Sequence, residues 1–178
     1  MNLPQETRYR AYSDWSKEEI AKINENVNQS PWHASYHIEP RTGLLNDPNG
    51  FSFFNGKYNL FYQNWPFGAA HGLKEWIHTE SDDLVHFYVT GAELRPDTEH
   101  DSHGAYSGSA YEVDGKLFLF YTGNVRDKKW IRDTLQIGAW MDKDHNITKC
   151  ENILIHKPAD VTEHFRDCLL YTSDAADE

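Results

Sequence analysis

Two β-hairpins of the same plan, 59 residues apart, are the feature that most constrains the fold of this chain. Each consists of an apolar run, a two-residue turn and a second apolar run. The turns are Asn55-Gly56 and Asp114-Gly115, dipeptides that two-residue hairpin turns favour because both positions need a positive φ. The flanking runs cover residues 51–54, 57–62, 110–113 and 117–121. The sequence therefore predicts antiparallel β structure built from a repeated unit.

Further strands are predicted between and after the hairpins. Residues 75–79 and 85–89 flank a turn at 81–83, and residues 135–141 precede a turn at 144–146. About four short strands per interval is typical of a propeller blade, although a β-sandwich is also compatible with this spacing. Aromatic residues make up 14% of the chain, which also favours β structure. We expect an all-β fold, and we favour a β-propeller over a sandwich.

A short amphipathic helix is predicted ahead of the strands. Ser16 and Glu19 fit the capping-box pattern, apolar residues then recur at helical spacing over 20–27, and residues 28–31 break the pattern. The predicted organisation is an N-terminal helical extension, a partial propeller that carries the catalytic site, and a short tail, at residues 1–31, 32–167 and 168–178.

The charge of the chain argues against two classes of partner. The 28 acidic and 17 basic residues give a formal charge of −11, which would repel the phosphates of nucleic acid and an anionic membrane surface. No apolar run approaches the roughly 18 residues of a membrane-spanning helix, and residues 1–10 lack the layout of a signal peptide. We therefore expect a cytoplasmic protein with no nucleic-acid or membrane partner.

The cysteines and histidines do not form a metal-binding pattern in the sequence. Cys150 and Cys168 are isolated, which is consistent with a reducing compartment. The ten histidines are scattered, without the i,i+4 or Cys-x-x-Cys spacing that metal ligands show. We expect no metal and no cofactor.

The segment LNDPNG at residues 45–50 has two interpretations. In the first, Asp47 or Asn46 caps the backbone in an Asx turn ahead of the hairpin. In the second, Asp47 is the nucleophile of a retaining glycosidase, in which one carboxylate attacks the anomeric carbon and a second acid, roughly 5–5.5 Å away, protonates the leaving oxygen. The residues of this segment alone leave both interpretations open.

Five short motifs that occur in a fixed order resemble a known family, and this resemblance favours the interpretation of Asp47 as a nucleophile. LNDPNG at 45–50 is followed by FYQN at 61–64, DLVH at 83–86, YSGS at 106–109 and FRD at 165–167. Together they resemble the invertases and fructan hydrolases of glycoside hydrolase family 32. The resemblance implies a five-bladed β-propeller with a central sugar-binding funnel, normally followed by a β-sandwich. A chain of this length would hold the first two to three blades and no sandwich.

The resemblance also implies roles for individual residues. Asp47 corresponds to the nucleophile that forms a covalent fructosyl-enzyme, and Asp167 to the carboxylate that stabilises the oxocarbenium-like transition state. Two departures from the family pattern bear on substrate preference: Ile77 stands where many members have Gly, and His71 where a Trp commonly walls the pocket. Tyr106 also stands where the family usually has Phe. The implied substrate-binding residues are Leu44, Leu45, Asn46, Gln63, His71, Trp76, Tyr106, Ser107 and Arg166.

The expected substrate is a small sugar, namely sucrose or sucrose 6-phosphate. Residues 71–76, 103–106 and 123–127 are most similar to bacterial family members that act on sucrose 6-phosphate. A hydrolase of fructans or fructooligosaccharides is an alternative within the enzyme class, and a non-catalytic sugar-binding propeller is an alternative outside it. Candidates for holding a 6-phosphate follow from charge only, and we favour the interpretation that they are solvated surface side chains. They are Lys74, Arg126, Lys128 and Lys129.

The end of the chain departs from the family. Family members continue from Arg-Asp with Pro, and their general acid is the Glu of a later Glu-Cys pair, which this sequence does not contain. We therefore expect a fragment that lacks the acid and is inactive by itself. Residues 168–178 resemble a translated sequencing-library adapter and are interpreted as non-native, with a natural acidic tail as the alternative.

Overall fold

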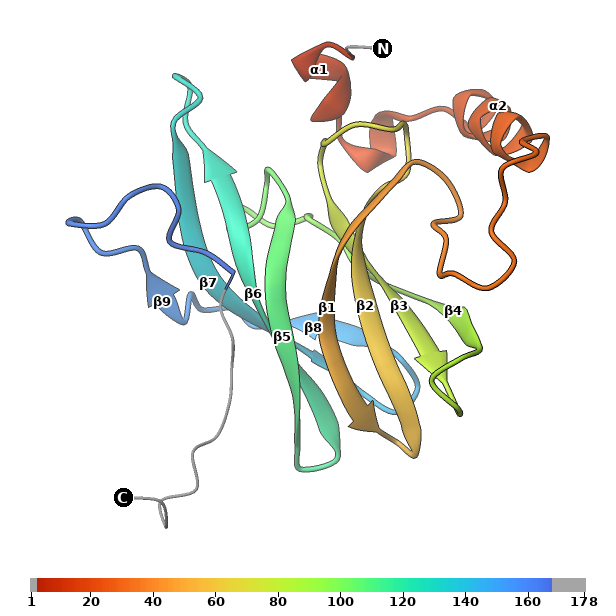
Figure 1. Cartoon of the computed structure of the whole chain (residues 1–178). Helices are drawn as coiled ribbons and strands as arrows, with labels where there is room; N and C mark the ends of the chain where they lie inside the picture. Colours follow the sequence, from red (N-terminus) through yellow and green to blue (C-terminus); the bar gives the residue numbers. More distant parts are fainter. Residues whose placement is uncertain (1–2, 168–178) are drawn as a thin grey trace.

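A computed structural model describes residues 3–167, which form two antiparallel sheets that lie side by side (Figure 1). Residues 168–178, predicted to be a non-native tail, lie outside the described residues. The first sheet has the order β1-β2-β3-β4. Its strands are β1 (Leu44–Phe54), β2 (Lys57–Trp65), β3 (Glu75–Ser81) and β4 (Phe87–Leu94).

The second sheet repeats this up-and-down order as β5-β6-β7-β8, and a short β9 also pairs with β7. All strand pairings within residues 3–167 are antiparallel. The predicted all-β architecture, with about four strands per repeated unit, is confirmed. The strands are β5 (Ala105–Val113), β6 (Lys116–Arg126), β7 (Arg132–Met141), β8 (Ile147–Lys149) and β9 (Ile155–His156).

Both predicted hairpin turns are present. Asn55 and Gly56 have φ values of 52° and 78°, and Asp114 and Gly115 have φ values of 50° and 75°. Positive φ at both central residues is the geometry whose twist matches that of the flanking strands. The two turns therefore set the register of β1 with β2 and of β5 with β6.

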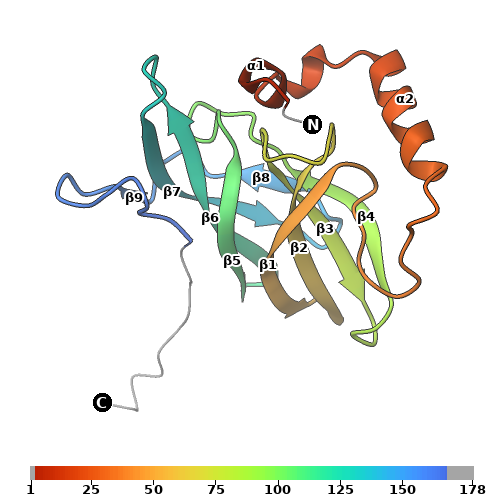
Figure 2. The same cartoon turned by 45° about the horizontal axis from the view of Figure 1, so that its top comes forward.

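The hydrophobic core lies where the two sheets pack together. Strands β1 and β5 are neighbours at the centre in both ribbon views (Figures 1 and 2). Full burial of a large apolar side chain stabilises a fold by about 1.5–3 kcal/mol, so this cluster holds the sheets together. Its largest members are Phe54, Phe61, Trp76, Leu94, Leu117, Leu119, Tyr121, Ile137 and Met141.

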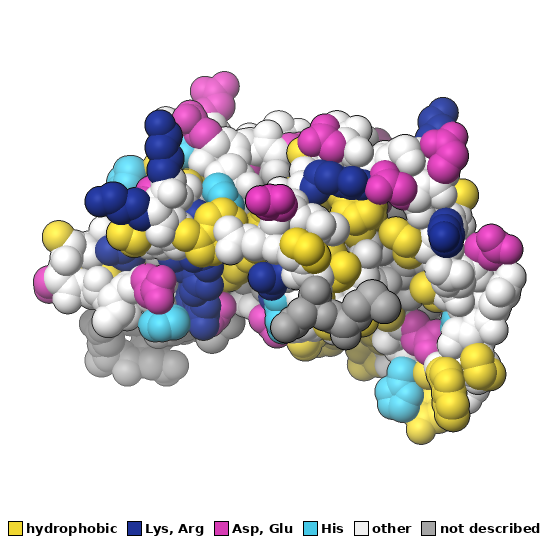
Figure 3. All heavy atoms as spheres, turned by 90° about the horizontal axis from the view of Figure 1, so that it is seen from above, with side chains coloured by type: hydrophobic (Ala, Val, Ile, Leu, Met, Phe, Trp, Pro, Cys, Tyr) yellow, Lys and Arg dark blue, Asp and Glu magenta, His cyan; other side chains and the backbone are white. Residues whose placement is uncertain are grey.

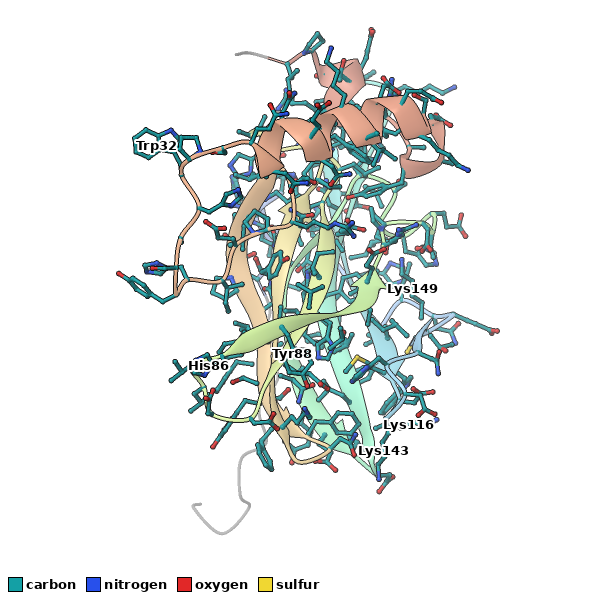
Figure 4. All side chains as sticks on the ribbon, turned by 90° about the vertical axis from the view of Figure 1, so that its right-hand side faces the viewer. Trp32, His86, Tyr88, Lys116, Lys143 and Lys149 are labelled. Carbon is teal, nitrogen blue, oxygen red and sulfur yellow. The ribbon has the colours of Figure 1, made fainter. Side chains whose placement is uncertain are left out.

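Polar contacts also join the sheets. His145, in the turn between β7 and β8, lies 2.6 Å from a carboxylate oxygen of Glu80 on β3. Lys149 of β8 pairs with Asp97 at 2.6 Å and with the buried Asp101, both between β4 and β5. Figure 4 shows Lys149 near one end of the edge strand β4 and His86 at the other.

His78 brings two of the scattered histidines together. One ring nitrogen of His78, one ring nitrogen of His145 and one carboxylate oxygen of Glu80 all lie within 4.8 Å of one another. The ring nitrogens of His78 contact Thr90 and Asn59, each at 2.8 Å. These side-chain partners satisfy the buried imidazole within its own sheet.

The N-terminal residues form α1 (Gln5–Arg8), a 3₁₀ turn η1 (Tyr12–Asp14) and α2 (Lys17–Asn28), which lie at one end of the sheets (Figure 2). The predicted capping box is confirmed: Glu19 N–H donates to Ser16 Oγ at 3.2 Å, and Ser16 N–H donates to Glu19 Oε2 at 2.9 Å. No helix within residues 3–167 is long and apolar enough to cross a membrane.

The N-terminal segment is attached to Leu73 by one backbone and one side-chain hydrogen bond. Leu73 N–H donates to the carbonyl of Arg8 at 2.7 Å, and the Tyr12 hydroxyl donates to the carbonyl of Leu73 at 2.8 Å. Residues 29–43 then lead to β1 without helix or strand, and Trp32, 87% exposed, points away from the sheets (Figure 4). The division into an extension at 1–31 and a propeller part at 32–167 stays a prediction.

Candidate active site

The site is built on two matching β-bulges in the central strands. In β1, Asn46 pairs with Gln63 and Pro48 with the preceding residue of β2, so Asp47 between them has no partner. In β5, Ser107 is left unpaired in the same way between Tyr106 and Gly108. A bulge bends the strand and re-aims the side chain of the extra residue. The two unpaired residues face each other, and the Ser107 hydroxyl donates to Asp47 Oδ2 at 2.8 Å.

Asn49 clamps the two bulges together. Its side-chain amide donates to the carbonyl of Asp47 at 2.7 Å, and its oxygen accepts from Gly108 N–H at 3.0 Å. A Cβ at Gly108 would lie 2.1 Å from the carbonyl oxygen of Phe120, so this position needs glycine. The interpretation of residues 45–50 as an Asx turn is therefore wrong, because β1 continues through the segment and Asn49 makes the capping contacts.

A hydrogen-bonded chain of buried and half-buried polar groups leads to Asp47. Gln63 Oε1 accepts from the Asn46 amide at 2.8 Å and from Lys74 Nζ at 2.9 Å. Gln63 Nε2 donates to Ser107 Oγ at 2.8 Å, which leaves the hydroxyl proton for Asp47. Such a chain fixes the orientation of each amide and of the serine hydroxyl.

Asp47 is an exposed carboxylate in a cationic setting. Partial burial raises its pKa, but the Asn46 amide, the Ser107 hydroxyl and the charge of Lys74 outweigh burial and hold the pKa below its usual value. Burial and the charge of Lys74 lower the pKa of the neighbouring His71. At neutral pH the site therefore presents an ionised Asp47 beside a neutral imidazole.

Asp167 reaches the same place from the far end of the described chain. Its backbone N–H donates to Thr122 Oγ1 at 3.2 Å, and Thr122 Oγ1 donates to the Gln136 side chain at 2.9 Å. Gln136 in turn donates to the carbonyl of Phe165 at 3.1 Å. Two buried side chains of the second sheet thus anchor the segment that holds Arg166 and Asp167.

These residues line one cavity of about 320 Å³. It holds two carboxylates and three cationic side chains, together with hydroxyl, amide and aromatic groups. Such a mixture suits a polyhydroxylated ligand, whose hydroxyl groups need both donors and acceptors. A larger cavity, about 500 Å³, lies beside the N-terminal segment and contains neither of these carboxylates. The lining residues of the smaller one are Tyr9, Asn46, Asp47, Gln63, His71, Lys74, Tyr106, Ser107, Arg132, Arg166 and Asp167.

Three of the expected substrate-binding residues are not brought to this cavity. Leu44 and Leu45 are half-buried partners of β2. Trp76 is fully buried in the core, where its indole N–H donates to the carbonyl of Tyr106 at 3.2 Å. Trp76 therefore supports a cavity wall from behind.

Three lining residues were not among the expected sugar-binding set. The sequence suggested Lys74 only as a candidate for binding a phosphate. Its place directly before the segment that forms the fully buried strand β3 could have indicated that its side chain points into the protein. Arg132 begins β7 and had only its charge to mark it. Tyr9 comes from the N-terminal segment, and no pattern in the sequence connects it to the cavity.

Comparison with known proteins places this geometry in a family. Residues 37–176 match the profile of the Glycosyl hydrolases family 32 N-terminal domain. The chain belongs to glycoside hydrolase family 32. A sucrose-6-phosphate hydrolase of Streptococcus mutans serotype c is 73% identical over 167 residues, which cover 94% of this chain and 35% of that protein.

Solved structures of family 32 proteins share the fold. The structure of a sucrose-6-phosphate hydrolase from Lactobacillus gasseri has a TM-score of 0.93 and 49% identity, over 97% of this chain and 36% of that one. A Bombyx mori family 32 β-fructofuranosidase variant in complex with sucrose has a TM-score of 0.75 and 30% identity, over 89% and 34% of the two chains. The chain spans about a third of the length of the curated relatives it matches.

The resemblance expected from the five motifs is thus confirmed, and so is the fold class. For a family 32 member, the two sheets correspond to two blades of the expected propeller. Of the two departures from the family pattern, Ile77 lies in the core and His71 lines the cavity.

Proposed function

We propose that the full-length protein is a retaining β-fructofuranosidase that hydrolyses the terminal β-D-fructofuranoside bond of sucrose or sucrose 6-phosphate. The observation that carries this proposal is an ionised Asp47, held by Ser107 in a polar cavity that it shares with Asp167. The names of the relatives support the substrate class, since they include sucrose-6-phosphate hydrolases and a β-fructofuranosidase in complex with sucrose.

In the proposed reaction, Asp47 attacks C2 of the fructosyl unit as the bond from C2 to the glucosyl oxygen breaks. An acid gives that oxygen a proton, and a fructosyl ester of Asp47 remains. Water, deprotonated by the same group, then attacks C2 and releases fructose with retained configuration. The hydrogen bond from Ser107 keeps one carboxylate oxygen in place, so that the other is free for attack.

Asp167 and Arg166 have a different role in this proposal. Positive charge develops on the fructosyl ring in the transition state, and a fixed carboxylate nearby stabilises it more than it stabilises the ground state. Arg166 Nε lies 3.3 Å from Asp167 Oδ2, which restrains the carboxylate. We assign ring stabilisation to Asp167, and sugar hydroxyl contacts to Arg166 and to the amides of Asn46 and Gln63.

The general acid is assigned to a part of the full-length protein beyond these residues. The two carboxylates of the cavity, Asp47 and Asp167, are both used in the steps above. General acid assistance contributes about 10²–10⁴-fold to such reactions. We therefore expect residues 1–178 alone to release no measurable fructose. Action inside the cell is part of the proposal, because a phosphorylated disaccharide is a substrate that arises there.

The test is Asp47→Asn in the full-length protein, measured by fructose release from sucrose and from sucrose 6-phosphate. Turnover should fall below about one part in 10³ with an unchanged fold, because the amide keeps the size of the side chain and lacks the attacking charge. Circular dichroism provides the folding control. Turnover near the unmodified level, or release of the inverted anomer by NMR, would refute the proposal.

A further inference from the structure

Two arginines at the end of the β6–β7 hairpin have no place in the chemistry above. Arg126 and Arg132 are paired directly across the two strands, in the last pair before the turn. Side chains of directly opposed residues lie on the same face of a sheet, and two like charges there destabilise the pair. An anion between or beside the two guanidinium groups would remove this repulsion.

No carboxylate of the described chain meets this need. Within residues 3–167, neither Arg126 nor Arg132 takes part in an ion pair of 4.0 Å or less. The Nε atoms of both are buried and have no hydrogen-bond partner there. Only one terminal nitrogen, Nη1 of Arg126, has a described acceptor, the carbonyl of Trp130 at 2.8 Å. Most of the donors of the two guanidinium forks therefore have no acceptor among the described residues and can serve a ligand.

Both arginines pack against aromatic rings, and one of the pair, Arg132, lines the cavity together with its ring partner Tyr106. The Arg132 guanidinium lies 5.6 Å from the ring centre of Tyr106, and that of Arg126 lies 5.1 Å from the ring centre of Trp130. Tyr9, which lines the cavity, contacts Trp130 edge-on at 5.1 Å. In the view from above, Lys and Arg side chains are spread over this face together with Asp and Glu side chains (Figure 3).

The other cations of the cavity are already engaged. Lys74 donates to Gln63 at 2.9 Å, and Arg166 pairs with Asp167 at 3.3 Å. The exposed Lys128 and Lys129 lie in the turn, outside the cavity lining. Arg132 lines the cavity, and Arg126, which lies outside the lining, is its direct cross-strand partner. Of the charge-based candidates for phosphate binding, this pairing favours Arg126, and the structure adds Arg132.

We propose that Arg126 and Arg132 form the subsite that binds the phosphate monoester of a phosphorylated disaccharide. The inference rests on the proposed function and names the substrate feature that the site selects. Arginine forks match phosphate oxygens in pairs, and the dianionic monoester balances the two positive charges.

The position of the pair along β7 fits the leaving sugar. Gln136, which anchors the segment of Asp167, lies four residues from Arg132 on this strand. Four residues correspond to about 13 Å of strand. The fructosyl ring has to lie at Asp47 and Asp167, so a phosphate at the arginines belongs to the second sugar, which departs as a sugar phosphate.

The experiment compares kcat/KM for sucrose 6-phosphate and sucrose in the full-length protein. In Arg132→Gln and in Arg126→Gln, the ratio of the two values should fall about ten- to a hundredfold, through KM for the phosphorylated substrate. Lys128→Gln and Lys129→Gln are matched controls from the same hairpin end and should leave the ratio unchanged. Glucose 6-phosphate should inhibit the unmodified protein more strongly than glucose, and the arginine variants should lose this difference.

The outcomes separate this inference from the function on which it rests. Hydrolysis of both sugars with an unchanged ratio in the arginine variants would overturn the subsite and leave the glycosidase proposal intact. Hydrolysis of neither sugar by the unmodified protein would refute the function itself. Equal losses for both sugars would assign the arginines a structural role and overturn the subsite. If a Gln variant fails to fold, Arg132→Lys keeps the charge without the fork and should lower the ratio by a smaller factor.

Discussion

Asp47 and Ser107 are 60 residues apart, yet each is the unpaired residue of a β-bulge, and their side chains meet at 2.8 Å. The contact spans the boundary between the two sheets, because Asp47 belongs to β1 and Ser107 to β5. The position of the proposed nucleophile therefore depends on how the sheets pack, as well as on its own strand.

Ser107→Ala should shift the pH dependence of the full-length enzyme. The hydroxyl is one of the groups that hold the pKa of Asp47 below its usual value, so its removal raises that pKa. Asp47 is active when ionised, and the acid-side loss of kcat/KM should therefore move to higher pH. We also expect about a tenfold lower rate at neutral pH. A pH–rate profile measures both effects, with the exposed Ser13→Ala as the control; an unmoved acid limb would contradict the role of the contact.

Asp167→Asn should lower kcat by about 10²-fold or more with a smaller change in KM. The carboxylate acts on charge that exists only in the transition state, whereas an amide still forms hydrogen bonds with sugar hydroxyls. Steady-state kinetics and competitive inhibition by fructose measure the two contributions. Equal losses in fructose binding and in kcat would mean that Asp167 serves binding alone.

Asn49→Ala should destabilise the junction of the two sheets. It leaves the carbonyl of Asp47 and the N–H of Gly108 without their side-chain partner. An unsatisfied polar group costs about 1–3 kcal/mol when it is fully buried, and these part-buried groups should cost about 1 kcal/mol each. Urea unfolding of the full-length protein should show the loss. Asn24→Ala on α2 removes an exposed hydrogen bond at 2.9 Å and should cost at most about 0.5 kcal/mol. Equal effects of the two substitutions would show that the clamp adds no stability.

His78 should make the fold sensitive to mild acid. Burial, with the charge of His145, lowers its pKa to about 4, against an unfolded value of about 6.5. The stability that this group contributes is present above pH 6.5 and is lost as the pH falls toward 4, by up to about 3 kcal/mol.

The measurement is urea unfolding at pH 7 and at pH 4.5 in the unmodified protein and in His78→Gln. The variant should lose less stability between the two pH values, because it has no imidazole to protonate. Parallel pH dependence in both proteins would assign the acid sensitivity to other groups, such as Glu80, whose pKa the Tyr88 and His145 hydrogen bonds lower despite burial.

The parts of the fold that could be predicted are those encoded by neighbouring residues. The Asn55-Gly56 turn and the capping box of Ser16 and Glu19 depend on local backbone preferences, and both are present. The bulges at Asp47 and Ser107 could not be predicted, because strand register is decided by a partner strand that no local pattern specifies.

The site shows the same limit. Family motifs identified Asp47, Gln63 and Ser107, and the structure unites them in one cavity. The motifs did not indicate that Trp76 lies in the core, because a motif residue can either line the cavity or pack behind the residues that line it. Arg132 was missed since its significance lies in its cross-strand partner Arg126, a relation fixed only by pairing.

The hydrogen bond from Leu73 N–H to the carbonyl of Arg8 affects when the N-terminal segment can reach its place during synthesis. The ribosome makes Arg8 first, and 65 further residues must be added before Leu73 exists, which takes roughly 3–13 s at about 5–20 residues per second. The capping contacts of helix α2, between Ser16 and Glu19, are local and do not have to wait. Tyr9 must wait, so the wall that it gives to the cavity is completed only after the first hairpin has left the ribosome.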